Sequence, residues 1–175
     1  MNPFNRHPDM KPTAASPLNR RQFLQRAAAG LALPLLVPGS VLGRNGVVAP
    51  SNRIVFGGIG MGHRARHILP NFLSFKAIHF AAVSDARRDR LQSAKEMVDA
   101  HYRNSDCAMH EDFRALLARP DIDAVLIATG NRWHAMASMF AAHAGKDIYC
   151  EKPISLTIQE GRNLVETCRR FGTIY

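Results

Sequence analysis

A glycine-rich turn directly after a short apolar segment is the most constraining feature of the sequence. Residues 53–59 read Arg-Ile-Val-Phe-Gly-Gly-Ile, which predicts a short buried strand that ends in glycines. The pattern Gly-x-Gly-x-x-Ala then runs from Gly60 through Gly62 to Ala65. In such a pattern the first glycine permits a tight turn, and the second lets the backbone approach a pyrophosphate. The small third residue lets the next helix pack on the strand. The segment therefore predicts a strand–turn–helix unit that binds a dinucleotide.

The predicted helix starts near Gly62, which would point its free N–H groups and its positive dipole end at the phosphates. Arg64 can add positive charge there or point into solvent. Pro70 lies inside this helix and is expected to kink it or to end its first part. The candidate cofactor-binding residues of the turn are Gly60, Met61, Gly62, His63, Arg64 and Ala65.

An acidic residue closes the second predicted strand, over residues 77–84. Asp85 follows Ala65 by 20 residues, where a carboxylate can accept the hydroxyls of an adenosine ribose. Asp85 could instead cap a helix that starts near Arg87. Arg87 and Arg88 would suit the 2′-phosphate of NADP, whereas the acid would repel it. We therefore expect NAD, with NADP as the alternative, and include Asp85 and Arg87 among the cofactor-binding residues.

Strands and helices alternate along the rest of the chain, which predicts an α/β fold with a doubly wound parallel sheet, the Rossmann fold. Ligands of such sheets bind at the carboxyl ends of the strands. The turn, Asp85, residues 129–134 and residues 151–153 should therefore share one rim. Residues 172–175 look like the opening of a sixth strand, near which the domain is cut short. Further strands are expected at 107–109, 124–128 and 147–150, and helices at 88–102, 112–118, 134–144 and 157–171.

Two segments resemble the Gfo/Idh/MocA oxidoreductase family. Residues 121–129 read Asp-Ile-Asp-Ala-Val-Leu-Ile-Ala-Thr, and residues 144–153 read Ala-Gly-Lys-Asp-Ile-Tyr-Cys-Glu-Lys-Pro. The resemblance extends from about residue 53 to residue 175. It implies hydride transfer between a sugar or polyol hydroxyl and NAD(P). It also implies that Lys152 is catalytic, as a buried ammonium near the nicotinamide, that Glu151 lines the cofactor pocket, and that Pro153 fixes the turn presenting the lysine. All three, Glu151, Lys152 and Pro153, are candidate cofactor-binding residues.

The loop after the fourth strand departs from that family. Relatives commonly read Thr-Pro-(Asp or Asn)-x-x-His, whereas this chain has glycine at the second position. Gly130 replaces a proline that would stiffen the loop, so a more mobile loop and weaker cofactor clamping are expected. Trp133 appears in one exported subgroup of relatives. His134 has no metal-ligand partners in the sequence and is expected to pack or to hydrogen-bond. The candidate cofactor-binding residues here are Ala128, Thr129, Gly130, Asn131, Trp133 and His134.

The first 43 residues resemble an export signal. A Pro-, Asn- and Ser-rich arm, expected to be disordered, precedes Arg20-Arg21-Gln22-Phe23-Leu24, which is similar to a twin-arginine translocation signal. Residues 27–43 are uncharged but contain two glycines and two prolines before the final glycine, so no stable membrane span is expected. The alternative is a basic helix docked on the domain. We predict recognition by the twin-arginine machinery, export to the periplasm or beyond, a linker over 44–52 and the Rossmann domain over 53–175.

The net charge of +9 does not indicate a nucleic-acid partner. Six of the 23 Lys and Arg lie at or before residue 44 against one acid, and the remaining 17 are interspersed with 13 acids. The three cysteines, Cys107, Cys150 and Cys168, have neither the spacing of a disulfide framework nor that of a zinc site, so no metal is expected.

Family members continue with a domain that binds substrate, which predicts that this chain is truncated and lacks it. Alone it should bind dinucleotide and turn over slowly or not at all, with the absent domain or a second copy as partner. Two other functions stay open. Some exported relatives are NAD-dependent glycoside hydrolases, although these tend to lose Glu-Lys-Pro. The chain could also be a non-catalytic dinucleotide-binding module.

Overall fold

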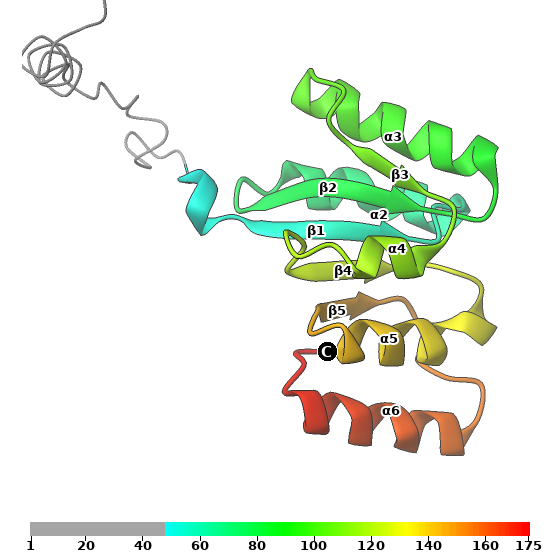
Figure 1. Ribbon diagram of the computed structural model, residues 1–175. Coiled ribbons are helices and arrows are strands. Elements are labelled where there is room, and N and C mark those ends of the chain that lie inside the picture. The colour runs from blue at the N-terminus through cyan, green and yellow to red at the C-terminus, as the bar shows by residue number, and fades with distance from the viewer. Residues whose placement is uncertain (1–47) are drawn as a thin grey trace, which may run out of the picture. The chain divides into compact units, whose positions relative to one another are not determined.

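A computed structural model of the protein describes residues 48–175 (Figure 1). The predicted arm and twin-arginine segment, and the first part of the predicted linker, lie outside these residues. The elements of the described part, in chain order, are η1 (Pro50–Asn52), β1 (Ile54–Ile59), α2 (His63–Ser74), β2 (Ile78–Ser84), α3 (Arg88–Tyr102), β3 (Ala108–His110), α4 (Phe113–Leu117), β4 (Ala124–Ile127), η2 (Asn131–Trp133), α5 (His134–His143), β5 (Asp147–Cys150) and α6 (Ile158–Phe171).

The five strands form one parallel sheet in the order β3-β2-β1-β4-β5. The order reverses at β1, which pairs with β2 on one side and β4 on the other. This is the doubly wound arrangement expected from the alternation of strands and helices. Because all strands run in the same direction, their carboxyl ends meet at one edge, where the loops after β1, β2 and β4 gather (Figure 1).

Both faces of the sheet are covered by helices (Figure 1). Residues of α2 and α3 pack with Phe56 and Phe80 against one face, and residues of α4 and α5 pack with Ile59 against the other. In β4, Leu126 belongs to the first of these clusters and Val125 to the second, and both are fully buried. A strand that is apolar at every position is therefore buried on both faces, as its sequence predicts. Helix α6 packs on α5.

Two local expectations need correction. Helix α2 is not ended by Pro70 but continues through it to Ser74, where packing of Leu69 and Leu73 in the core outweighs the loss of one backbone hydrogen bond. Residues 172–175 form no strand among the described residues. The backbone N–H of Ile148 nevertheless donates a hydrogen bond to the carbonyl of Ile174 at 2.9 Å. A strand that paired with the outer side of β5 would accept bonds of this kind.

The ends of α6 explain why its boundaries match the sequence expectation closely. The Thr157 hydroxyl accepts from the backbone N–H of Glu160, and the Glu160 carboxylate accepts from that of Thr157, which forms a capping box. Gly172 ends the helix with a φ of +68°. No helix within residues 48–175 is long and apolar enough to cross a bilayer.

Candidate functional site

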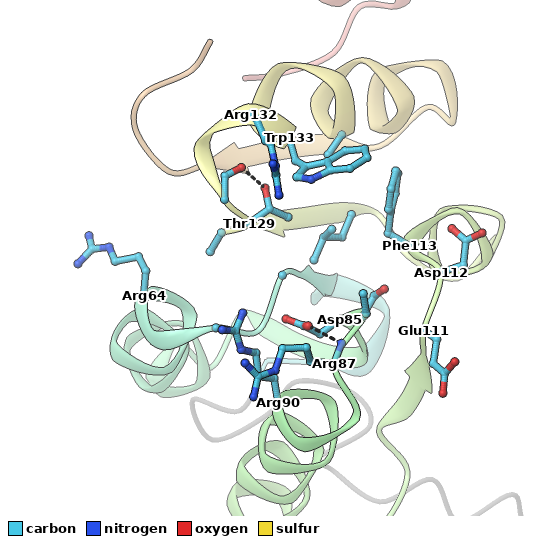
Figure 2. Close-up of a pocket in the computed structure, with 18 of the residues that line it drawn as sticks. Arg64, Asp85, Arg87, Arg90, Glu111, Asp112, Phe113, Thr129, Arg132 and Trp133 are labelled. Carbon is cyan, nitrogen blue, oxygen red and sulfur yellow. Dashed lines mark hydrogen bonds between the residues drawn. The ribbon is translucent and has the colours of Figure 1, made fainter. Parts of the chain in front are cut away.

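A pocket of about 910 Å³ lies at the carboxyl ends of β1, β2 and β4. Its wall includes the glycine turn after β1, the loop after β2, the loop between β3 and α4, and the loop after β4 (Figure 2). Ten residues proposed from the sequence contribute to its wall, namely Gly60, Gly62, His63, Arg64, Asp85, Arg87, Ala128, Thr129, Gly130 and Trp133. The fold therefore brings together segments up to 73 residues apart, from Gly60 to Trp133.

The glycine turn requires glycine for two separate reasons at Gly60. Its φ is +80°, a conformation that costs free energy for any residue with a Cβ. A Cβ built there would also lie 2.6 Å from Cα of Thr129 and 2.7 Å from its backbone N. The turn after β1 is thus pressed against the loop after β4. Met61 and Ala65 from the same motif are fully buried and face the core rather than the pocket.

The first turn of α2 presents its N–H groups to the pocket. Gly62 is the N-cap without a side-chain cap hydrogen bond, and the first turn contains no acidic residue. Its free donors and its positive dipole end are therefore available to an anion. A Cβ on Gly62 would come within 3.2 Å of a guanidinium nitrogen of Arg90, so the glycine also leaves room for that cation.

Asp85 is half-buried at the end of β2, where one carboxylate oxygen, Oδ1, accepts from the backbone N–H of Arg87 at 2.9 Å (Figure 2). Asp85 is not the N-cap of α3. That position is Arg87, which makes no side-chain cap bond. Among residues 48–175, no hydrogen bond occupies the second oxygen of Asp85. Two bonds from the Arg87 guanidinium, at 3.0 and 2.7 Å, go instead to Asp89. The Asp85 carboxylate thus keeps one acceptor oxygen for a ligand, while the Arg87 guanidinium is engaged by Asp89.

Sequence patterns did not identify the other ten wall residues, among them Arg90, Phe113 and Arg132. Arg90 lies in the first turn of α3, and its guanidinium approaches the glycine turn. The sequence feature that could have identified Arg90 is its place in the first turn of the helix that follows β2, next to the buried Leu91 but on another face. Phe113 begins α4 and lies on the same side of the pocket as Trp133 (Figure 2). Its ring also packs against the core cluster on that face of the sheet.

In the loop after β4, Gly130 has the backbone conformation that the proline of the family would have at this position. Gly130 has φ −68° and ψ 147°, which proline would adopt, and a Cβ there would meet nothing within 4 Å. The Trp133 side chain, 44% exposed, lines the pocket, whereas the exposed Asn131 does not. His134 is 1% exposed and does not line the pocket either. Its ring nitrogens face backbone carbonyls.

The loop after β5 lies beside the pocket rather than in its wall. Buried Glu151 accepts from the Arg64 guanidinium at 2.8 Å, which joins this loop to α2. The next residue, Lys152, is exposed in this structure, whereas a buried ammonium was expected. Pro153 is exposed too and follows Lys152 through a cis peptide bond. The Lys152 side chain is therefore exposed, while its neighbours Glu151 and Pro153 are hydrogen-bonded to residues of α2 and α5.

The ion pair between Arg64 and Glu151 predicts a titration that can be measured. The hydrogen bond from Arg64 holds the pKa of Glu151 below its ordinary value of 4.5. Because the folded-state pKa is lowered, the pair stabilises the fold above pH 4.5 and loses that contribution as the pH falls through the lowered pKa. We expect Arg64→Met to raise the Glu151 pKa, measured by carboxyl NMR titration. Arg66→Met, an exposed arginine on the same helix, is the control, and a Glu151 pKa unmoved in Arg64→Met would contradict the prediction.

A model of the GFO_IDH_MocA family, described as an oxidoreductase family with an NAD-binding Rossmann fold, matches residues 53–175. Glycosyl hydrolase family 109 protein 1 of Shewanella sp. (strain ANA-3) is 28% identical over 176 residues, which cover 87% of this chain and 37% of that protein. The uncharacterized oxidoreductase YrbE of Bacillus subtilis (strain 168) is 32% identical over 122 residues, 70% of this chain and 34% of its own length. The chain thus spans about a third of the length of these relatives.

Among solved structures, the 3-ketoreductase KijD10 from Actinomadura kijaniata, in complex with NADP and TDP-benzene, is similar with a TM-score of 0.62. It is 28% identical, and the match covers 70% of this chain and 36% of that one.

Proposed function

The chain belongs to the GFO_IDH_MocA oxidoreductase family through an NAD(P)-binding Rossmann domain, and on that basis we propose that it is the nucleotide-binding half of an enzyme that transfers hydride between a sugar or polyol hydroxyl and NAD. The observation that carries the proposal is the pocket itself. It joins the Gly60 turn, the uncapped start of α2 and the partly free carboxylate of Asp85 at one edge of the sheet.

The residues present fit a dinucleotide. The N–H groups at the start of α2 would hold its pyrophosphate, with the guanidinium of Arg90 above Gly62 adding positive charge. The free oxygen of Asp85 would accept from the adenosine ribose. Phe113 and Trp133 offer apolar surface along the wall. When bound, the cofactor supplies the nicotinamide that exchanges hydride with the substrate carbon.

Lys152 would act on the substrate rather than on the cofactor. In its neutral form, the exposed amine of Lys152 would accept the proton of the reacting hydroxyl at Nζ as hydride leaves the carbon, and the ammonium so formed would return that proton to the carbonyl oxygen in the reverse direction. Its two neighbours support that role, because Glu151 is joined to Arg64 and the carbonyl of Pro153 contacts His134. The backbone on both sides of the lysine is therefore tethered while its side chain stays accessible.

Cofactor choice is tested by two aspartate variants. We expect Asp85→Ala to weaken NAD binding by about 10- to 100-fold, since the ribose loses hydrogen bonds to a charged acceptor, and to leave NADP binding unchanged or stronger. Asp89→Ala is the matched comparison: it releases the Arg87 guanidinium and should strengthen NADP binding while leaving NAD binding unchanged. Calorimetric titration of each variant with each cofactor gives the dissociation constants.

The outcomes of that titration separate the candidates. NAD binding that is insensitive to Asp85→Ala would contradict the ribose role. Preference for NADP in the unaltered chain would instead make Arg90 and a released Arg87 the phosphate contacts, in line with the NADP bound by the 3-ketoreductase relative. Binding of neither cofactor by the folded chain would overturn the proposed function.

A second candidate function is glycoside hydrolysis by way of bound NAD. It is favoured by the similarity to glycosyl hydrolase family 109 proteins of Shewanella and to an alpha-N-acetylgalactosaminidase of Shewanella oneidensis. The sequence Glu151-Lys152-Pro153 argues for the dehydrogenase instead. Release of nitrophenol from a nitrophenyl N-acetylgalactosaminide without net NAD reduction would favour hydrolysis. NAD reduction with free sugars or polyols would favour the dehydrogenase. NAD binding with neither activity is expected both of a nucleotide-binding half without its substrate domain and of a non-catalytic module.

We also propose that the protein is exported by the twin-arginine machinery. The proposal is supported by Arg20-Arg21 followed by Phe23-Leu24 and an uncharged stretch over residues 27–43. Replacing Arg20 and Arg21 together by lysine, in an epitope-tagged chain, should retain the protein in the cytoplasmic fraction of the host. Unchanged export of that variant would contradict the proposal.

A further inference from the structure

A buried histidine at the start of α5 faces two carbonyls from two different loops. The Nδ1 atom of His134 is 2.6 Å from the carbonyl oxygen of Pro153, and its Nε2 atom is 3.1 Å from that of Thr129. The side chain is 1% exposed and does not contribute to the pocket wall. Since carbonyl oxygens only accept, a neutral imidazole can donate one of these bonds and an imidazolium both.

Each of the two loops matters to the candidate site for a different reason. Thr129 lines the pocket and lies against the glycine turn, where a Cβ on Gly60 would be 2.6 Å from its Cα. Pro153 directly follows Lys152, whose other neighbour, Glu151, is joined to Arg64. His134 therefore links a loop in the wall of the pocket to the segment carrying the lysine, in addition to the ion pair between Arg64 and Glu151.

We propose that His134 is a positioning residue that couples the loop at 128–130 to the segment at 151–153, so that the placement of Lys152 follows the occupancy of the pocket. The proposal rests on the function proposed above, in which the pocket takes a dinucleotide. His134 acts through backbone carbonyls and touches neither the pocket nor, on this view, the cofactor. Its role is thus distinct from the cofactor contact expected for it from the sequence.

Two variants separate the two contacts. In His134→Asn the amide nitrogen takes the place of Nδ1 and can still donate toward Pro153. In His134→Gln the amide nitrogen reaches the place of Nε2 and can still donate toward Thr129. His143→Gln, at the opposite end of α5 and exposed, is the matched control. Hydrogen exchange of the full chain, followed by mass spectrometry with and without NAD, reports on peptides that cover 128–133 and 151–157.

Without NAD, we expect hydrogen exchange in residues 151–157 to be about two- to tenfold faster in His134→Gln, because this variant loses the hydrogen bond to Pro153. Exchange in residues 128–133 should be faster by a similar factor in His134→Asn, because this variant loses the hydrogen bond to Thr129. With NAD, both segments of the unaltered chain and of His143→Gln should exchange more slowly. Both His134 variants should keep NAD binding and the response of 128–133 but lose the response of 151–157.

The result that overturns the coupling is a response of 151–157 to NAD that is as large in both His134 variants as in the unaltered chain. The same holds if NAD slows exchange only in 128–133 of the unaltered chain, a measurement that does not depend on how the variants fold. Absence of calorimetric NAD binding by the unaltered chain would overturn the proposed function, and the coupling with it. NAD binding without the coupled response overturns the coupling alone.

Discussion

Gly60→Ala is expected to lower the free energy of unfolding by about 2–6 kcal/mol, because a positive φ and an overpacked contact each cost about 1–3 kcal/mol. The φ of +80° is one source of strain. The other is the contact at 2.6 Å with Cα of Thr129, which is backbone and cannot rotate away. Relief of the contact would displace the turn or the loop after β4, so the remaining folded protein should also lose dinucleotide binding. Urea unfolding and calorimetry measure the two effects.

Gly130→Ala is the matched control for that substitution. It adds the same methyl group in the neighbouring loop, but its φ is −68° and a Cβ there has open space around it. We expect its stability to stay within about 0.5 kcal/mol of the unaltered chain, or to rise slightly because alanine restricts the unfolded chain. Equal destabilisation by the two alanines would show that the turn tolerates a side chain, contrary to the geometry.

Lys146→Met is expected to destabilise the fold by about 2–3 kcal/mol, the range for hydrogen bonds made by a charged donor. The side chain is 8% exposed, and its ammonium donates to the carbonyls of Arg119 and Ile122, both at 2.8 Å. Methionine keeps the length and the apolar stem but leaves both carbonyls without this donor. The loop that leads into β4 should loosen, and the midpoint of urea unfolding should fall without a change in slope.

The other lysine of the same sequence motif provides the comparison. Lys152→Met alters an exposed residue and should change stability by less than about 0.5 kcal/mol. On the proposed function, it should impair turnover of substrate by the enzyme and leave NAD affinity intact. If Lys152→Met destabilised the domain as strongly as Lys146→Met, the division between a structural and a functional lysine would be wrong.

The sequence predicted the doubly wound parallel sheet, and several residues that line the pocket, where its patterns had one physical meaning. The glycine turn from Gly60 to Ala65 and the apolar strand at β4 each leave few alternatives, because a positive φ and burial on both faces select particular residues. Asp85 and Thr129 then reach the same pocket because parallel strands present their carboxyl ends together. Periodicity also placed α3 at Arg88–Tyr102 without error.

Contacts between distant loops could not be read in the same way. The part that His134 plays depends on which carbonyls lie beside a buried ring, and nothing in its neighbours along the chain encodes Pro153. The expected burial of Lys152 was wrong: the motif implied that this lysine is buried, whereas the structure exposes Lys152 and buries Lys146. At Pro70 a local rule was insufficient. Proline was expected to kink the helix or to end its first part, whereas tertiary packing keeps α2 continuous through this residue.

The burial of the three cysteines lowers the reactivity of their thiols. Cys107 is 4% exposed, and burial raises the pKa of its thiol to about 11, while burial also raises the pKa of Cys150 and Cys168. Oxidants and disulfide partners attack the thiolate, so a thiol that stays protonated reacts slowly. All three are free in the described structure. While the domain stays folded, the three thiols should therefore react slowly with oxidants and with disulfide partners.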